Sequence, residues 1–173
     1  SGQATDVTID NVKIYPVNDK HNATTVFYGD EQITDAKNRT GFASHDWDDH
    51  NVTGTTVTVS GGKLVVVTDD GSTDQEGVKL AINLVDGAGS AHAIKAGRTY
   101  SMSADIQVTA GSTSNAMQFT IGGNSSSNFS ITGSEATYTK SILTSNDSGD
   151  VVVKLSSTSA KDTTTFTVNN VTI

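Results

Sequence analysis

Apolar and polar residues alternate along most of this chain, and this period of two constrains the fold more than any other feature. In the segment 77–85, GVKLAINLV, the apolar residues Val78, Leu80, Ile82 and Leu84 alternate with Lys79, Ala81 and Asn83. Successive side chains of a β-strand point to opposite faces, so such a segment turns one face to a core and one to water. No segment keeps a helical period over several turns. The sequence therefore predicts an all-β protein.

The alternating segments recur at short intervals and are separated by turn-forming residues. The predicted strands lie at residues 56–68 (two strands joined through Ser60, Gly61 and Gly62), 77–85, 99–108, 116–122, 136–144, 150–157 and 164–173. Asp, Asn, Ser and Gly dominate between them, as at 69–72, 86–89 and 146–149, and these residues favour turns. Many short strands joined by polar turns indicate a β-sandwich, and we expect the jelly-roll form.

The two termini carry near copies of one strand-like segment. Residues 5–14 read TDVTIDNVKI and residues 164–173 read TTFTVNNVTI, with the apolar positions in the same register. We predict that residues 1–16 are the closing strand of a preceding repeat or a donated strand, that residues 17–34 are a connector, and that residues 35–173 form the sandwich. A lone strand needs a partner for its backbone groups. The repeated segment therefore predicts that this strand pairs with neighbouring copies or repeats of the module. The alternative is that it is an ordinary strand in the chain's own sheet.

The composition argues against several functional classes. The formal net charge is −8, from 11 basic and 19 acidic residues. A nucleic-acid partner is not expected, because no basic stripe is available to neutralise phosphates. Cysteine is absent, which excludes disulfides, thiolate chemistry and cysteine-based zinc sites. No apolar run approaches the roughly 20 residues of a membrane-spanning helix, so membrane insertion is not expected.

Three segments carry a resemblance to a known family: GFASHDW (41–47), KAGRTYSMSADIQV (95–108) and FTVNNVTI (166–173). From about Thr40 onward, the order of elements resembles the family 4/9-type carbohydrate-binding modules. The resemblance implies a jelly-roll β-sandwich, here with an appended N-terminal strand. The segment HNATTVFYGDE (21–31) is also similar to segments found between such modules in phage structural proteins, and this resemblance makes a tail fibre a candidate setting.

The densest polar cluster is HDWDDHN, residues 45–51. Asp46, Asp48, Asp49 and Asn51 supply hard oxygen ligands at close spacing, as a calcium site requires. The family resemblance implies a structural calcium that is held near the first strand and by an acid in the last strand. This chain has Asn169 at the latter position, and a neutral amide is a weaker ligand. The alternative to calcium is a solvated acidic loop.

Glycan recognition calls for exposed aromatic rings and planar polar side chains. Alternation assigns Tyr100, Phe119 and Phe166 to the core and leaves Tyr28, Phe129 and Tyr138 as candidate rings. Trp47 is a further candidate, although its place in GFASHDW favours packing. Four polar residues at outward strand positions are predicted to form one sugar-binding face: Gln75, Asn83, Gln107 and Gln118. Such faces are also often merely solvated.

No catalytic motif is present in the sequence. The three glutamates, Glu31, Glu76 and Glu135, lie in turn-like polar contexts, and there is no nucleophile elbow or P-loop. We therefore expect no enzyme activity. The leading hypothesis is a non-catalytic structural or adhesion module of a virion fibre or extracellular filament, with a cell-surface glycan as candidate ligand. The alternative is a carbohydrate-binding module of a secreted polysaccharide-degrading enzyme.

Overall fold

The computed structural model of the chain describes residues 33, 36–42, 45–50, 54–68, 75–81, 94, 96–111, 116–146, 150–156 and 163–173. The chain divides into two compact units, residues 1–30 and 31–173, and every described residue belongs to the second. The predicted strand at residues 1–16 lies outside the described residues, as does the predicted connector apart from Ile33. Ile33 is 2% exposed and belongs to the core, so the packed module begins before the predicted boundary at residue 35.

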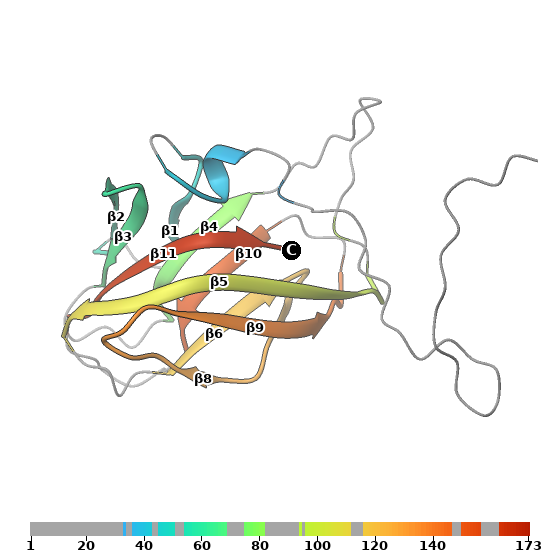
Figure 1. Cartoon of the computed structure of the whole chain (residues 1–173). Helices are drawn as coiled ribbons and strands as arrows, with labels where there is room; N and C mark the ends of the chain where they lie inside the picture. Colours follow the sequence, from blue (N-terminus) through green and yellow to red (C-terminus); the bar gives the residue numbers. More distant parts are fainter. Residues whose placement is uncertain are drawn as a thin grey trace, which may run out of the picture. The chain divides into compact units, whose positions relative to one another are not determined.

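Two antiparallel sheets form the module (Figure 1). The six-stranded sheet has the order β1 (Asp48–His50), β4 (Gly77–Ala81), β10 (Asp150–Leu155), β6 (Ala116–Ile121) and β7 (Asn124–Ser125), and β8 (Phe129–Ser130) also pairs with β6. The five-stranded sheet has the order β2 (Thr56–Ser60), β3 (Lys63–Val67), β11 (Thr165–Thr172), β5 (Thr99–Ala110) and β9 (Ala136–Leu143). The predicted all-β sandwich is confirmed.

Helical structure in the described ranges is limited to the short 3₁₀ element η1 (Ala36–Asn38), which precedes β1. A bilayer-crossing helix, with the length and apolar character that it needs, does not occur among these residues.

The alternation read from the sequence builds the core between the sheets. Along β5, Met102, Ala104 and Ile106 are fully buried, whereas the intervening Ser103 and Asp105 are only partly covered. The same pattern holds along β6 and β3. Burial of a large apolar side chain contributes about 1.5–3 kcal/mol relative to its exposure. Each sheet therefore has one apolar face packed in the core and one outer face.

The predicted strand segments all contain strands, and residues 56–68 form the expected hairpin. Gly61 and Gly62 have φ values of 59° and 75°, as a tight two-residue hairpin requires. Three short strands are not predicted by the sequence. They are β1, inside the acidic cluster, and β7 and β8, inside the Gly/Ser-rich segment 121–130. Two or three residues are too few for an alternating pattern to be recognised.

β11 occupies the middle of the five-stranded sheet, with β3 on one side and β5 on the other. Its pairing with β5 is irregular between Asn169 and Thr172, and Asn170 has a φ of 48°. Asparagine tolerates this left-handed conformation better than most residues. The irregularity shifts the alternation by one residue, so Val168 and Val171 both reach the core.

The bulged strand is held from two sides through Asn170. Its Nδ2 donates to Asp105 Oδ2 at 2.6 Å, and Thr40 Oγ1 donates to Asn170 Oδ1 at 2.7 Å. In the N-terminal copy, Asn11 stands at the matching position and the apolar residues keep the same irregular spacing. The repeat therefore copies the residue types of a bulged strand, although residues 5–14 themselves lie outside the described residues.

Gly77 is required by the close approach of β4 and β10. A Cβ atom at this position would overlap the carbonyl oxygen of Val153 and lie 2.6 Å from Lys154 Cα. Both obstacles are backbone atoms, so no side-chain movement can relieve the overlap. Gly133 differs, because a Cβ there would meet only Val108 O at 3.9 Å, which is ordinary contact.

We expect the substitution Gly77→Ala to lower the free energy of unfolding by about 1–3 kcal/mol or more, because it forces the two central strands apart. Gly133→Ala is the matched control and should leave stability within about 0.5 kcal/mol of the parent. Equilibrium unfolding in urea measures both. Equal midpoints for the two variants would contradict the close approach.

Candidate functional site

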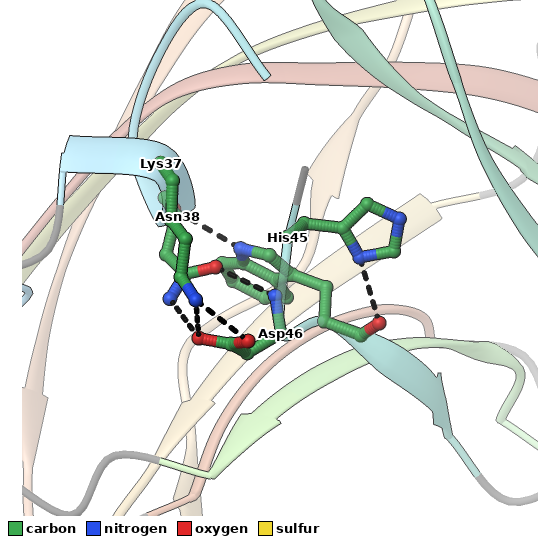
Figure 2. A network of polar contacts seen from close by, with 5 residues as sticks. Lys37, Asn38, His45 and Asp46 are labelled. Atoms are coloured by element: carbon green, nitrogen blue, oxygen red, sulfur yellow. Dashed lines mark hydrogen bonds and ion pairs between the residues drawn. The ribbon is translucent and has the colours of Figure 1, made fainter. Parts of the chain in front are cut away.

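Asp46, in the acidic cluster, is held by two side chains of η1. Lys37 Nζ lies 2.8 Å from Asp46 Oδ2, and Asn38 Nδ2 donates to the same oxygen at 3.0 Å. The backbone N–H of Asp46 donates in return to Asn38 Oδ1 at 2.8 Å. Figure 2 shows Lys37 and Asn38 converging on this carboxylate. The hydrogen bonds from Lys37 and then Asn38 lower the pKa of Asp46 below its ordinary value.

The other acids of the cluster do not converge with Asp46. Asp48 and Asp49 are successive residues of β1 and point to opposite faces of the strand. Asp48 Oδ1 accepts a hydrogen bond from the backbone N–H of Asp49 at 2.9 Å, and this bond lowers the pKa of Asp48. Asn169 lies on β11, in the other sheet.

The described members of the cluster do not by themselves form a group of metal ligands. Within the described residues, no group of three or more His, Asp and Glu side chains is placed to hold a metal ion. Asn51 lies outside the described residues. Calcium binding therefore stays a prediction of the sequence.

Trp47 is a core residue rather than an exposed ring. It is 4% exposed, and its Nε1 donates to the carbonyl oxygen of Asn38 at 3.0 Å. His45 Nδ1 lies 2.9 Å from the Trp47 carbonyl oxygen, so this ring nitrogen carries the proton. The hydrogen bond from the indole to Asn38 connects η1 to the start of β1. Its burial rules out the role of sugar-stacking platform and agrees with the packing role.

Phe129 and Tyr138 pack on each other at one edge of the sandwich. Their ring centroids are 4.8 Å apart with an interplanar angle of 25°. Phe129 is 8% exposed and also lies 4.8 Å from the ring of Phe119. Phe129 is therefore a packing residue that joins β8 to β9, and the half-buried Tyr138 packs against the core. The remaining candidate ring, Tyr28, lies outside the described residues.

The glutamines expected on one polar face lie on different sheets. Gln107, on β5, donates through Nε2 to Gly133 O at 2.8 Å. Gln118, on β6, donates through Nε2 to Asn128 Oδ1 at 2.8 Å. Their outer faces point in opposite directions, so the prediction of one shared face is wrong. The sequence shows which residues point outward but not to which sheet they belong.

The outer face of the six-stranded sheet carries two rows of side chains aligned by strand register. The first row reads His50, Gly77, Lys154 and Gln118 across β1, β4, β10 and β6. The second row reads Asp48, Lys79, Val152, Thr120 and Ser125 across β1, β4, β10, β6 and β7. Residues directly opposite each other in an antiparallel pair share a face, with Cβ atoms about 4.5–5.5 Å apart. We call these two rows the outer polar face.

Lys154 is the most buried charged member of the outer polar face, at 8% exposure. Its Nζ donates to Gln75 Oε1 at 2.8 Å, and Gln75 Nε2 donates to Ser156 O at 3.0 Å. Burial lowers the pKa of Lys154. In the described part of the chain, the ion pairs join Lys37 to Asp46 and Lys63 to Glu135, and none involves Lys154.

His50 shares the first row with Lys154 and is separated from it by Gly77. Burial lowers the pKa of His50 most, followed by the positive charges of Lys154 and Lys79, whereas Asp150 and Asp49 act in the opposite direction. The imidazole is therefore mainly neutral near neutral pH. A neutral imidazole can both donate and accept hydrogen bonds.

The arrangement of these sheets is similar to that of carbohydrate-binding modules of known structure. A mutant of the family 29 module CBM29-2 superposes with a TM-score of 0.56 at 11% identity, over 78% of this chain and 86% of that chain. The apo form of BiXyn10A CBM1 gives 0.56 at 18% identity, over 78% and 92%. A CBM4 structure gives 0.51 at 17% identity, over 73% and 92%. No protein-family model and no curated protein matches the sequence.

At these identities the likeness concerns the fold, and it confirms the expected resemblance to a carbohydrate-binding-module jelly roll. Sequence reasoning names Gln118 as a candidate but misses its row partners His50 and Lys154. The available signal for Lys154 is its outward position in the predicted strand at residues 150–157, whereas β1 is too short to give such a signal for His50. That signal does not reveal that β1, β4, β10 and β6 are neighbours.

We expect Asp46→Asn to reduce stability at neutral pH, because Lys37 and Asn38 stabilise the charged carboxylate. The folded-state pKa is lowered, so this contribution is present above the unfolded pKa of about 3.9. It is lost as the pH falls through the lower folded-state value. Urea unfolding from neutral to acidic pH should therefore show the parent and variant curves converging in acid. Lys37→Met should reproduce the loss at neutral pH. Curves that stay parallel at every pH would refute the role of this carboxylate.

Proposed function

We propose that this module is a non-catalytic glycan-recognition domain that binds an extended sugar chain across the outer polar face. The observation that carries the proposal is the pair of parallel rows of mostly polar residues, interrupted by Gly77 and Val152, on a fold shared with carbohydrate-binding modules. One structural neighbour, another CBM29-2 mutant, is complexed with cellulohexaose. An extended oligosaccharide is therefore a reasonable class of ligand to test first.

The dimensions of the outer polar face suit a linear ligand. The second row crosses five strands, from β1 to β7. Four spacings of about 4.8 Å give a row roughly 19 Å long. Asp48, Lys79, Thr120 and Ser125 supply donors and acceptors along it, on either side of the buried Val152. These features support binding along the row rather than capture of a single small molecule.

The described carboxylates support binding rather than hydrolysis. Glycoside hydrolysis uses two carboxyl groups that face each other across the scissile bond. Among the described glutamates, Glu135 pairs with Lys63 and Glu76 is fully buried. On the outer polar face, Asp48 is the one acid in either row, and its carboxylate accepts from its own strand.

We further propose that the module is displayed outside the cell or on a virion, as one unit of a repetitive fibre or filament. The support is the N-terminal copy of the β11 sequence, including the asparagine of its bulge. β11 already pairs on both sides, so a strand donated in its place would have to displace it. A preceding module that ends with residues 1–16 needs no displacement, and we favour tandem modules over strand exchange for this reason.

A glycan-binding module of a secreted polysaccharide-degrading enzyme is the second candidate function. The same fold and the same outer polar face support it. The two candidates differ in what accompanies the module: further copies of itself in a fibre, or a catalytic domain in an enzyme.

We expect Gln118→Ala to weaken glycan binding about 3- to 10-fold, because it removes a hydrogen-bonding amide from the β6 end of the first row. Gln107→Ala removes the same side chain from the opposite outer face and should change affinity less than about twofold. Affinity electrophoresis in gels that contain soluble polysaccharides measures both. A loss with Gln107→Ala alone would move the binding site to the five-stranded sheet.

We expect deletion of residues 1–16 to leave the melting temperature of the module unchanged, because both sides of β11 are already paired. If those residues complete the chain's own sheet, the deletion should instead lower the melting temperature by several degrees or cause aggregation. Light scattering and negative-stain microscopy, each with calcium and with chelator, test assembly and the calcium prediction together. Filaments that disappear with the deletion would support strand pairing between copies. A monodisperse monomer in every condition would leave only the tandem-module proposal.

A further inference from the structure

We infer that the glycan bound by the outer polar face is acidic, a polysaccharide whose carboxylate or sulfate groups pair with Lys154 and Lys79. The inference rests on the proposed function and names the chemical class of its ligand.

The first observation is the uncompensated charge of Lys154. Its side chain is more than nine-tenths buried, and its ammonium group donates to the neutral amide oxygen of Gln75 at 2.8 Å. A buried charge is costly unless an opposite charge pairs with it. No described carboxylate does so. An anionic group of a ligand would supply the missing partner.

The second observation is the distribution of charge around Lys154. The first row, His50, Gly77, Lys154 and Gln118, contains no acid. The acids near it lie off this row. Asp48 is opposite Lys79 in the second row, Asp49 points to the other face of β1, and Asp150 is at the far end of β10. The first row is therefore the positive part of the outer polar face.

The first row has no side chain at Gly77, and both Gly77 and Lys154 are buried. Gly77 lies directly between His50 and Lys154 in the register, and it contributes no side chain. A larger residue is excluded there by the β10 backbone.

The third observation is the absence of a stacking ring in the two rows. Phe119, Phe129 and Trp47 are buried, and no member of either row is aromatic. A neutral glycan would have to bind without ring stacking at the described part of this face. Charge-assisted hydrogen bonds are about twice as strong as neutral ones, so an acidic glycan compensates for the missing ring.

The net charge of −8 does not prevent such binding at physiological salt. Charges further than about 8 Å away are largely screened there. The local row then decides the interaction, and the distant acids contribute mainly to solubility.

The decisive experiment compares polygalacturonate with its fully methyl-esterified form, because the two share one sugar backbone and differ in charge. Dextran sulfate and unmodified dextran form the second pair, and cellohexaose is the neutral reference. Binding is measured by calorimetry with the full chain, at low salt and again with added sodium chloride. We expect polygalacturonate or dextran sulfate to bind, their neutral counterparts to bind at least tenfold more weakly, and affinity to fall with added salt.

The variants Lys154→Gln and Lys79→Gln should each weaken binding of the acidic polymer about tenfold, the effect of losing one charge-assisted hydrogen bond. Lys140→Gln removes the same charge from β9 of the other sheet and should have little effect. Thermal melting checks each variant, and Lys79→Gln carries the test if Lys154→Gln does not fold.

The outcomes separate the inference from the proposed function. Binding to one acidic polymer alone supports the inference and identifies carboxylate or sulfate as the recognised group. Equal binding to the charged and neutral members of a pair overturns the inference but leaves the proposed function standing. No binding to any of the five polymers and oligomers overturns both.

Discussion

Two strands from the C-terminal part of the chain hold both sheets together. β10 pairs with β4 and β6, and β11 pairs with β3 and β5, so the loss of either strand would divide its sheet into two pieces. These partners are distant in sequence, as the hydrogen bond from Thr68 N to Thr164 O at 3.0 Å illustrates. Such pairings form only after large loops close, and this makes a fold of this type slow to form. The N-terminal repeat is therefore a copy of the strand that holds the five-stranded sheet together.

The outer polar face depends on the same two-sided pairing. Val151, Val153 and Leu155 of β10 enter the core, and the alternation turns Lys154 to the outer face beside Gln118 and Gly77. A slip of one residue in this register would bury the ammonium group in the core and expose the valines. The core therefore specifies the spacing of the polar rows, and the rows need no rigid loop to position them.

Residues that are adjacent in the sequence point in different directions where the segment forms a β-strand, because successive side chains lie on opposite faces. The acids of residues 46–49 look like one calcium cluster in the sequence, yet Asp46 is held by η1 while Asp48 and Asp49 point to opposite faces of β1. Residues far apart in the sequence also come together. His50, Lys154 and Gln118 form one row because three pairings align them. The candidate site of this module is therefore a property of strand order.

The sequence by itself determined the all-β class, the positions of the longer strands and the division of their residues between core and solvent, because alternation is local and the backbone alone converts it into two faces. It also showed the terminal repeat, down to the asparagine that the bulge of β11 accommodates. Only the tertiary structure decided that Trp47 is buried, that Gln107 and Gln118 belong to opposite sheets, and that Lys154 and His50 share one row across β4. Strand order depends on which long-range pairings bury the most apolar surface together, and no local pattern carries that information.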